Sequence, residues 1–210
     1  MEKKVIEHFL KRKETYIKKR KFKGILNKSI ICEVGCGARP TYRPTSYFIG
    51  VDIVPELLRE LKREYESNPV IADARKLPIR DDVSEVVVSN MLLHHIVGVN
   101  VRASDENVVK TIKEFKRIVK DNGEIRIHEW LPRNHFLKYL MYNLTRFLSD
   151  IKMECPYLGI YKGVITNFNT ETFYKKIFEN LGLCYKVLEF HPWIIQGIVI
   201  GRGAWMNLKK

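Results

Sequence analysis

The amino-acid sequence predicts an α/β fold: a mostly parallel, seven-stranded sheet with helices on both faces and an antiparallel final strand. Three observations predict it. From residue 29 onward, short apolar runs alternate with stretches of helical periodicity. The chain has 210 residues, 45% of them hydrophobic, which suits one domain with a sizeable core. The last two apolar runs have only a short connection, which favours an antiparallel pair.

Seven apolar runs are the predicted strands. They cover residues 30–34, 47–52, 69–73, 85–90, 124–130, 184–190 and 194–200. The last two are expected to join around His191-Pro192-Trp193. The first of these runs, residues 30–34, ends at Gly35 and is typical of a buried parallel strand.

Helical periodicity occupies three of the gaps between these runs. Pro55 suits the first turn of a helix with an apolar face from Leu57 to Tyr65. A second helix is expected over about 105–120, with Asn122-Gly123 as its C-terminal stop. Thr170 is the expected N-cap of a third helix, which Gly182 ends.

Two segments stand outside this alternation. Residues 1–28 are predicted to form a basic amphipathic helix in front of a domain over residues 29–210. Its apolar stripe is expected to pack on its own domain rather than on a membrane. Residues 133–165 are rich in aromatic and aliphatic side chains and resemble an inserted helical lid. Core packing or a dimer contact explains this insert equally well, so the oligomeric state stays open.

The formal net charge of +13 is concentrated at the N-terminus. Residues 1–23 hold ten Lys/Arg and three Glu, a net charge of +7. This segment can contact RNA phosphates, anionic lipid heads or an acidic substrate, or it can simply be a solvated face. The charge therefore indicates a candidate contact with RNA without deciding it.

Several classes of protein are excluded or disfavoured by composition. No apolar run approaches the roughly 20 residues that span a bilayer, and no signal-peptide core follows the charged start. A cytoplasmic protein is therefore expected. The four cysteines lack a second ligand pair at zinc spacing, so reduced thiols and no metal are expected. The single glutamine is a compositional hint of a thermophilic source.

The loop after the first predicted strand reads Gly35-Cys36-Gly37-Ala38-Arg39-Pro40. A dinucleotide-binding loop needs a third glycine where Pro40 stands, followed by a helix aimed at pyrophosphate. A P-loop is excluded because no G-K-[ST] follows. The two glycines instead predict close approach of the backbone to a bulky ligand without phosphate.

Acidic side chains stand near the ends of the first three predicted strands. In an open α/β sheet, ligands bind beyond the carboxyl ends of the strands. Glu33 precedes the glycine loop, Asp52 can accept hydrogen bonds from two ribose hydroxyls, and Asp73 can accept one from an adenine amine. Ile53 offers an apolar wall and Ala74 a backbone contact. Together they favour an adenosine that carries a cationic sulfonium tail.

Residues 30–130 resemble class I S-adenosylmethionine-dependent methyltransferases, which have a Rossmann-like fold, and especially the ubiquinone/menaquinone methyltransferase-like group. The matching segments are Ile31-Cys32-Glu33-Val34-Gly35-Cys36-Gly37, Ile49-Gly50-Val51-Asp52-Ile53, Ala72-Asp73-Ala74-Arg75-Lys76-Leu77-Pro78 and Val88-Ser89-Asn90-Met91-Leu92-Leu93-His94-His95. The resemblance implies S-adenosyl-L-methionine as the cofactor. It places Glu33, Gly35, Cys36 and Gly37 around the methionine moiety, Asp52 on the ribose, Ile53, Asp73 and Ala74 on the adenine, and Asn90 and Met91 beside the sulfonium.

The sequence departs from this family at the glycine loop. Arg39 replaces the usual third glycine, prolines shorten the first helix, and Ser84-Glu85 stands where an aromatic-Asp pair is usual. These departures leave the contacts to the methionine carboxylate open, and Arg39 is a candidate for one of them.

Methyl transfer from a sulfonium depends largely on positioning and desolvation, and needs a general base only if the acceptor must lose a proton. The candidates for such a base are His94, His95, His128, Glu129 and His135. His94 and His95 can equally be packing residues at a helix start, and Glu129 and His135 residues of the lid or a turn. No catalytic residue is assigned.

Three functions remain. Ser89-Asn90-Met91-Leu92 lacks the N/D-P-P-Y/F pattern of enzymes that methylate base amino groups, and no Pro-Cys nucleophile is present there. The leading hypothesis is methyl transfer to a small molecule, apolar or aromatic, under the insert. The second is methylation of tRNA, supported by the basic N-terminus and by Leu77-Pro78 and His94-His95, which wobble-uridine tRNA methyltransferases share. The third is a non-catalytic, cofactor-binding partner subunit.

Overall fold

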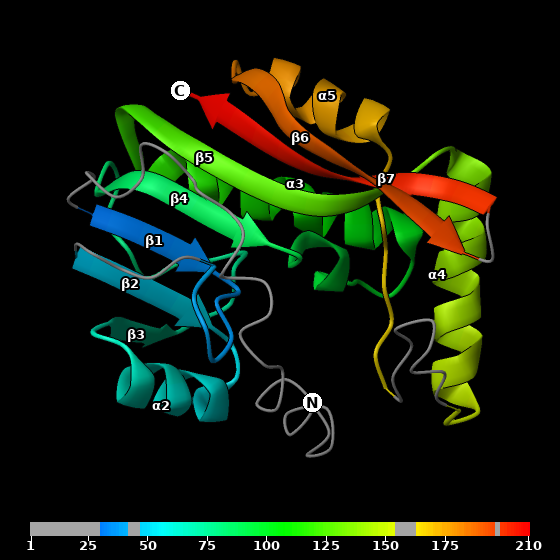
Figure 1. Ribbon diagram of the computed structural model, residues 1–210, viewed down its shortest axis with the longest axis horizontal. Coiled ribbons are helices and arrows are strands. Elements are labelled where there is room, and N and C mark those ends of the chain that lie inside the picture. The colour runs from blue at the N-terminus through cyan, green and yellow to red at the C-terminus, as the bar shows by residue number, and fades with distance from the viewer. Residues whose placement is uncertain (1–29, 42–46, 154–162, 196–197) are drawn as a thin grey trace. The chain divides into compact units, whose positions relative to one another are not determined.

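The computed structural model describes residues 30–41, 47–153, 163–195 and 198–210 (Figure 1). The predicted basic helix over residues 1–28 lies outside the described residues, and so does Cys155. The described residues belong to two compact units. The first contains residues up to 90, residues 114–126 and Lys210; the second contains residues 91–113 and 127–209.

Seven strands form one hydrogen-bonded sheet in the order β3-β2-β1-β4-β5-β7-β6. Their bounds are β1 Ile30–Val34, β2 Tyr47–Asp52, β3 Asn68–Ile71, β4 Ser84–Asn90, β5 Val119–Pro132, β6 Cys184–Ile195 and β7 Ile198–Lys209. β1 pairs in parallel with β2 and β4, and β2 in parallel with β3. β6 and β7 are antiparallel. The predicted fold class and its antiparallel final strand are therefore confirmed.

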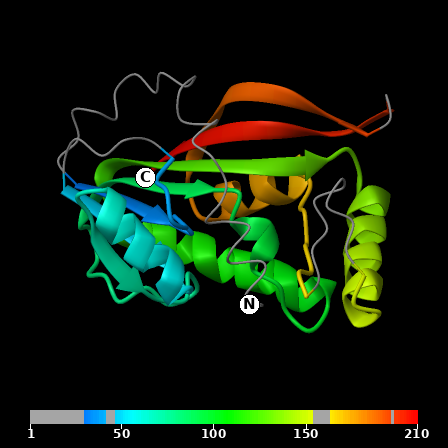
Figure 2. The same ribbon diagram turned by 60° about the horizontal axis from the view of Figure 1, so that its bottom comes forward.

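In the first unit, helix α2 (Pro55–Glu64) packs against β2 and β3 (Figures 1 and 2). Pro55 begins the helix as predicted, because its fixed φ suits the first turn and its missing N–H leaves no donor there. Leu57, Leu58 and Leu61 form the buried face. In the connection between β1 and β2 the structure describes residues 35–41, and these form no helix. The prolines after the glycine loop had predicted this.

The second unit contains the short 3-10 helix η2 (Leu93–His95), most of α3 (Val101–Ile118), α4 (His135–Asp150) and α5 (Glu171–Asn180). The Thr170 side chain accepts a hydrogen bond from Phe173 N–H and so caps α5 as predicted. Gly182 follows that helix with φ 64°, a conformation that glycine adopts without strain. α5 packs against β6.

Helix α4, within the predicted insert, has an unusual distribution of side chains. Its buried residues are Lys138, Tyr142 and Thr145, all of which carry a polar group. Its exposed large hydrophobic side chains are 40–71% accessible: Phe136, Tyr139, Leu140, Leu144 and Phe147. The insert is thus helical over residues 135–150, and its role as a lid stays a prediction.

The predicted connection between the last two strands was wrong. His191, Pro192 and Trp193 lie inside β6, paired with Gly203, Arg202 and Gly201, and β7 continues to Lys209. Proline is tolerated here because β6 is the edge strand of the sheet, where a missing N–H breaks no interior pairing. A proline in an apolar run was mistaken for a turn.

Other boundaries also differ, among them both ends of β5, which was predicted over 124–130 and covers Val119–Pro132. α3 begins at Val101 and ends at Ile118, and Asn122-Gly123 lies within β5 instead of ending the helix. A Cβ on Gly123 would lie 3.0 Å from the Glu85 carbonyl oxygen, so this glycine allows close strand approach. β3 ends at Ile71, which leaves Ala72 and Asp73 in the following turn. Within the described residues, no helix is long and apolar enough to cross a membrane.

Candidate functional site

The carboxyl ends of β1, β2 and β4 lie at one edge of the first unit. The parallel register places Glu33 beside Gly50 and Val88, and Val34 beside Val51. Gly35, Asp52 and Asn90 therefore end or follow their strands at the same edge. The predicted cofactor residues of this unit are brought together there by strand pairing, as the general geometry of α/β sheets requires.

The glycine loop is held by the end of β2. The N–H groups of Gly35 and Cys36 both donate to the Val51 carbonyl, at 2.8 and 3.1 Å. Gly35 and Gly37 have φ values of 75° and 59°, which disfavour other residues. A Cβ on Gly37 would meet no atom within 4 Å, so the loop presents bare backbone to open space.

Asp52 connects the glycine loop to the turn after β2. Its Oδ2 accepts from Gly37 N–H at 2.9 Å, and its Oδ1 accepts from Val54 N–H at 3.0 Å. Burial raises the pKa of this carboxyl, and hydrogen bonds from the backbone of Val54, Gly37 and Ile53 partly oppose that rise. Each carboxylate oxygen keeps a further lone pair for another donor. The neighbouring Ile53 is 64% exposed.

Glu33 is buried and belongs to a polar chain with Thr41 and Asn90. Its carboxylate accepts from Thr41 N–H, at 2.9 Å to Oε2, and from the Thr41 hydroxyl. The Asn90 side-chain amide donates to that hydroxyl at 3.2 Å. Burial raises the pKa of Glu33 to about 7, against the lowering by the Thr41 hydrogen bonds. Thr41 was missed by sequence reasoning, because a threonine in a loop carries no distinguishing signal.

Asp73 has a partner that the sequence prediction did not include. Arg75 donates to both of its carboxylate oxygens, with Nη2 2.5 Å from Oδ2, and its backbone N–H donates to Oδ1 at 2.8 Å. The Arg75 hydrogen bond lowers the pKa of Asp73. Ala74, which stands between Asp73 and Arg75 in the sequence, is buried. Asp73 thus remains an ionised acceptor, shared with Arg75.

Cys36 is a buried thiol rather than an exposed one. Burial raises its pKa well above the ordinary value for cysteine, and burial does the same for Cys32. Ala38, two residues after Cys36 in the same loop, packs with Val54 and Leu57. These side chains support the loop from inside. Within the described residues, no group of three or more His, Cys, Asp or Glu side chains is arranged to hold a metal ion.

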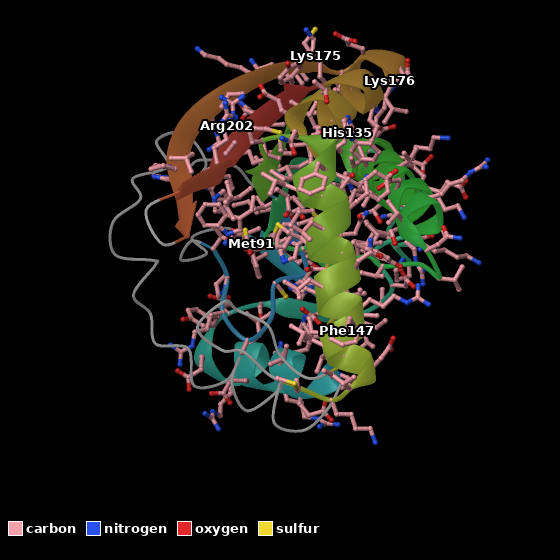
Figure 3. All side chains as sticks on the ribbon, turned by 90° about the vertical axis from the view of Figure 1, so that its right-hand side faces the viewer. Met91, His135, Phe147, Lys175, Lys176 and Arg202 are labelled. Atoms are coloured by element: carbon pink, nitrogen blue, oxygen red, sulfur yellow. The ribbon has the colours of Figure 1, made fainter. Side chains whose placement is uncertain are left out.

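In the second unit, Met91 begins the turn after β4 and is labelled in Figure 3. Its φ is 57°, the left-handed conformation that a residue with a Cβ rarely adopts. Its N–H donates to the His128 carbonyl at 2.9 Å. Two residues further, Leu93 N–H donates to Oε1 of Glu129 at 2.6 Å.

Glu129 and His94 form a buried pair. Oε2 of Glu129 lies 2.7 Å from Nδ1 of His94, and both side chains are at most 5% exposed. Burial raises the pKa of Glu129 to about 8, and the Leu93 N–H bond acts in the opposite direction. The His94 ring also stacks on Phe168, with ring centroids 4.4 Å apart.

The other base candidates are placed differently. The rings of His94 and His95 have centroids 4.0 Å apart, whereas His128 stacks on Trp205 at 4.7 Å. His135 begins α4 and is exposed, at the upper end of that helix in Figure 3. The structure therefore brings His94, His95 and Glu129 together, and His135 does not join the buried pair.

An ion pair between the buried Lys138 and the partly buried Asp105 was also missed. Nζ of Lys138 lies 2.7 and 2.6 Å from the two Asp105 carboxylate oxygens, and 2.6 Å from Oδ1 of Asn169. The Asn167 amide donates to the same Asp105 at 2.8 Å. The network joins α3, α4 and the segment before α5. No sequence signal pairs residues this far apart.

Comparisons with known proteins bear on the family and on the fold of the chain. Residues 32–127 match the family model described as the methyltransferase domain. The structure is similar to a SAM-dependent methyltransferase from Methanosarcina mazei, with TM-score 0.62, 15% identity, and coverage of 86% of this chain and 92% of that one. It is also similar to the magnesium protoporphyrin IX methyltransferase of Synechocystis with SAH bound, with TM-score 0.58, 12% identity, and coverage of 89% and 76%. At these identities the likeness shows the fold.

The sequence is also similar to that of a tRNA methyltransferase. The chain is 32% identical over 104 residues to the tRNA (carboxymethyluridine(34)-5-O)-methyltransferase of Arabidopsis thaliana. The match covers 49% of this chain and 24% of that protein. The chain thus spans about a quarter of the length of the first curated relatives that it matches.

Proposed function

We propose that the S-adenosylmethionine-dependent methyltransferase domain formed by residues 32–127 methylates tRNA, at a carboxylate carried by a modified uridine. The observation that carries this proposal is the 32% identity over 104 residues to a tRNA carboxymethyluridine methyltransferase. The net charge of +13 supports an RNA acceptor over a small neutral one. The +7 segment over residues 1–23 is the first candidate for contact with phosphates.

The residues of the first unit fit the cofactor, which supplies an electrophilic methyl group on a sulfonium. We assign Asp52 to the ribose hydroxyls, because each of its oxygens already accepts one backbone N–H and retains capacity for another donor. Gly35 and Gly37 leave room for the methionine moiety, together with Glu33 and Cys36. Ile53, Asp73 and Ala74 are assigned to the adenine and Asn90 to the surroundings of the sulfonium. Met91, the next residue in the chain, is assigned there from its place in the sequence.

A carboxylate acceptor suits the chemistry of the described residues. A carboxylic acid with an ordinary pKa of about 4 is ionised at neutral pH, so it attacks the methyl group without a general base. Glu129 is hydrogen-bonded to His94 and accepts from Leu93 N–H, which is typical of residues that hold structure. The protein then contributes mainly positioning and exclusion of water.

The proposal is tested by methyl transfer from tritiated S-adenosylmethionine to three separate fractions: total tRNA, total lipid and small metabolites. Label is expected in the tRNA, and mild alkali should release it as volatile methanol because a methyl ester hydrolyses. Binding to tRNA should weaken roughly tenfold or more between low and moderate salt, as several phosphate contacts require. Alkali-stable label in tRNA would refute the carboxylate, and label confined to another fraction would refute tRNA.

The matched variants are Asp52→Ala and Asp121→Ala. Asp52→Ala should lower the affinity for S-adenosylhomocysteine, measured by calorimetry, by roughly 100-fold, since it removes hydrogen bonds to the ribose. Asp121 is 84% exposed in the same unit, and its loss should leave that affinity unchanged. Cofactor binding by the wild type without transfer to any fraction would instead support the non-catalytic partner subunit.

A second candidate acceptor is a small apolar or aromatic molecule. It is favoured by the exposed stripe of α4 that includes Phe136, Leu140 and Phe147, and by the resemblance to the ubiquinone/menaquinone methyltransferase-like group. Double substitution of Phe136 and Phe147 by serine separates the two acceptors. Transfer to a lipid or metabolite fraction should fall with this variant if the stripe covers the acceptor.

A further inference from the structure

The backbone of Met91 is in the left-handed conformation, which is strained for any residue that has a Cβ. A non-glycine residue at φ 57° costs roughly 1–2 kcal/mol relative to an ordinary conformation. Such a conformation persists only where surrounding contacts impose it. Among the described residues, the other non-glycine residues with positive φ are Asp82, Asn122 and Lys152. Asp82 and Lys152 lie in exposed turns.

The turn donates two hydrogen bonds to acceptors in one short segment of β5. The His128 carbonyl accepts from Met91 N–H, and the Glu129 carboxylate accepts from Leu93 N–H. The two acceptors are neighbours in sequence, and so the turn is attached at two points to a strand that is buried there. Both donors are backbone groups, so the contacts depend on conformation and not on the identity of residues 91 and 93.

The Glu129 carboxylate is itself fixed in orientation. Its second oxygen is bonded to His94 Nδ1, whose ring stacks on Phe168. The His94 carbonyl accepts from Asn167 N–H at 2.8 Å. A carboxylate that is 1% exposed and bonded through both oxygens has few alternative positions, so it is a rigid acceptor for Leu93.

We propose that Glu129, oriented by His94, is a positioning residue that holds the Met91 turn in its left-handed conformation for methyl transfer. The inference rests on the proposed function, since the place of Met91 beside the sulfonium is part of that proposal. Glu129 acts through the backbone of residues 91–93 and does not touch the reacting atoms. Its hydrogen bonds, rather than its proton, are what the reaction needs.

The conservative variant tests this directly. In Glu129→Gln the amide oxygen can accept from Leu93 N–H while the amide nitrogen donates to His94, so both bonds persist. Its kcat should stay within about threefold of the wild type, whereas Glu129→Ala should lose roughly 10- to 100-fold in kcat. The KM for S-adenosylmethionine should change little in either variant. Equal loss in Gln and Ala would overturn the proposal, because it would indicate a proton-transferring base. An unchanged Ala variant would overturn it as well.

A matched pair at position 91 provides a second test that tolerates loss of stability. Met91→Ala and Met91→Gly both remove the side chain, but only glycine adopts positive φ without strain. In the Glu129→Ala background, Met91→Gly should exceed Met91→Ala in kcat by roughly 5- to 30-fold. With Glu129 present the ratio should be near one, since the turn is already held. The same ratio in both backgrounds would overturn the inference.

Failure of the proposed function is separately visible. If the wild-type protein binds no S-adenosylhomocysteine in calorimetry, or transfers no methyl group to any fraction, the function itself fails. If binding and transfer are intact while Glu129→Ala retains full kcat, only the positioning role fails. Thermal unfolding of each variant shows whether a loss of kcat comes from a folded protein.

Discussion

The buried ionisable side chains of the two units have different kinds of hydrogen-bond partner. In the first, Glu33 and Asp52 are satisfied mainly by backbone N–H groups and the Thr41 hydroxyl. In the second, Lys138 is satisfied by the side chains of Asp105 and Asn169, and Glu129 by the His94 side chain together with the Leu93 N–H. Backbone donors are present in any sequence that forms the loop, whereas side-chain partners depend on particular residues. The first arrangement therefore suits a binding loop, and the second suits rigid attachment between elements.

The largest effect is expected at Lys138. Lys138→Met removes one partner of a pair in which the lysine is 3% exposed, and it leaves Asp105 with the Asn167 amide. The free energy of unfolding, from urea titration, should fall by about 3–5 kcal/mol. Lys138→Met combined with Asp105→Asn should cost less than Lys138→Met alone, since the uncompensated charge is gone. The exposed Lys110→Met should change stability by less than about 0.5 kcal/mol. Equal losses in the single and double variants would contradict the ion-pair account.

Two of the carboxyl groups with a raised pKa, Glu33 in the first unit and Glu129 in the second, should produce a pH dependence of stability that distinguishes the units. A carboxyl whose folded pKa exceeds its unfolded value of 4.5 adds stability below pH 4.5, and that stability is lost as pH rises to the folded pKa. The loss ends near pH 7 for Glu33 and near pH 8 for Glu129.

Urea unfolding of the wild type, Glu33→Gln and Glu129→Gln between pH 5 and pH 8 checks this. Each glutamine variant should remove a decline on the order of 3 kcal/mol from the wild-type profile. The part of the decline between pH 7 and pH 8 should disappear only in Glu129→Gln. A profile that both variants leave unchanged would show that neither carboxyl titrates in this range.

The smallest effect compares two glycines with the same conformation. Gly37 in the first unit and Gly182 in the second have φ values of 59° and 64°, and neither has an atom within 4 Å of an added Cβ. Each change to alanine should cost about 1 kcal/mol of stability through strain alone. Only Gly37→Ala should also weaken cofactor binding in calorimetry, because its Cβ would enter the space assigned to the cofactor. Equal binding by both variants would remove Gly37 from the proposed site.

Much of the first unit could be predicted from sequence. The sequence predicted three of its elements: the buried strand at residues 30–34, the strand at 47–52 and the helix that begins at Pro55. Each depends on the local hydrophobic pattern and on the glycine and proline residues that end or begin an element. The side chains at the strand ends were brought to one edge because parallel pairing leaves little alternative. The hairpin at the C-terminus was misplaced because Pro192 in an edge strand has the same local signature as a turn.

By itself, the sequence determined the fold class, the glycine loop and the row of side chains at the strand ends, because these depend on local pattern and on the regular geometry of a parallel sheet. Only the tertiary structure decided that Thr41 binds Glu33 and that Glu129 is hydrogen-bonded to His94. It also decided that α4 buries Lys138 and exposes Phe136. The physical reason is the same in each case. A buried polar group must find a partner, and which partner lies within about 3 Å is settled by packing between distant segments.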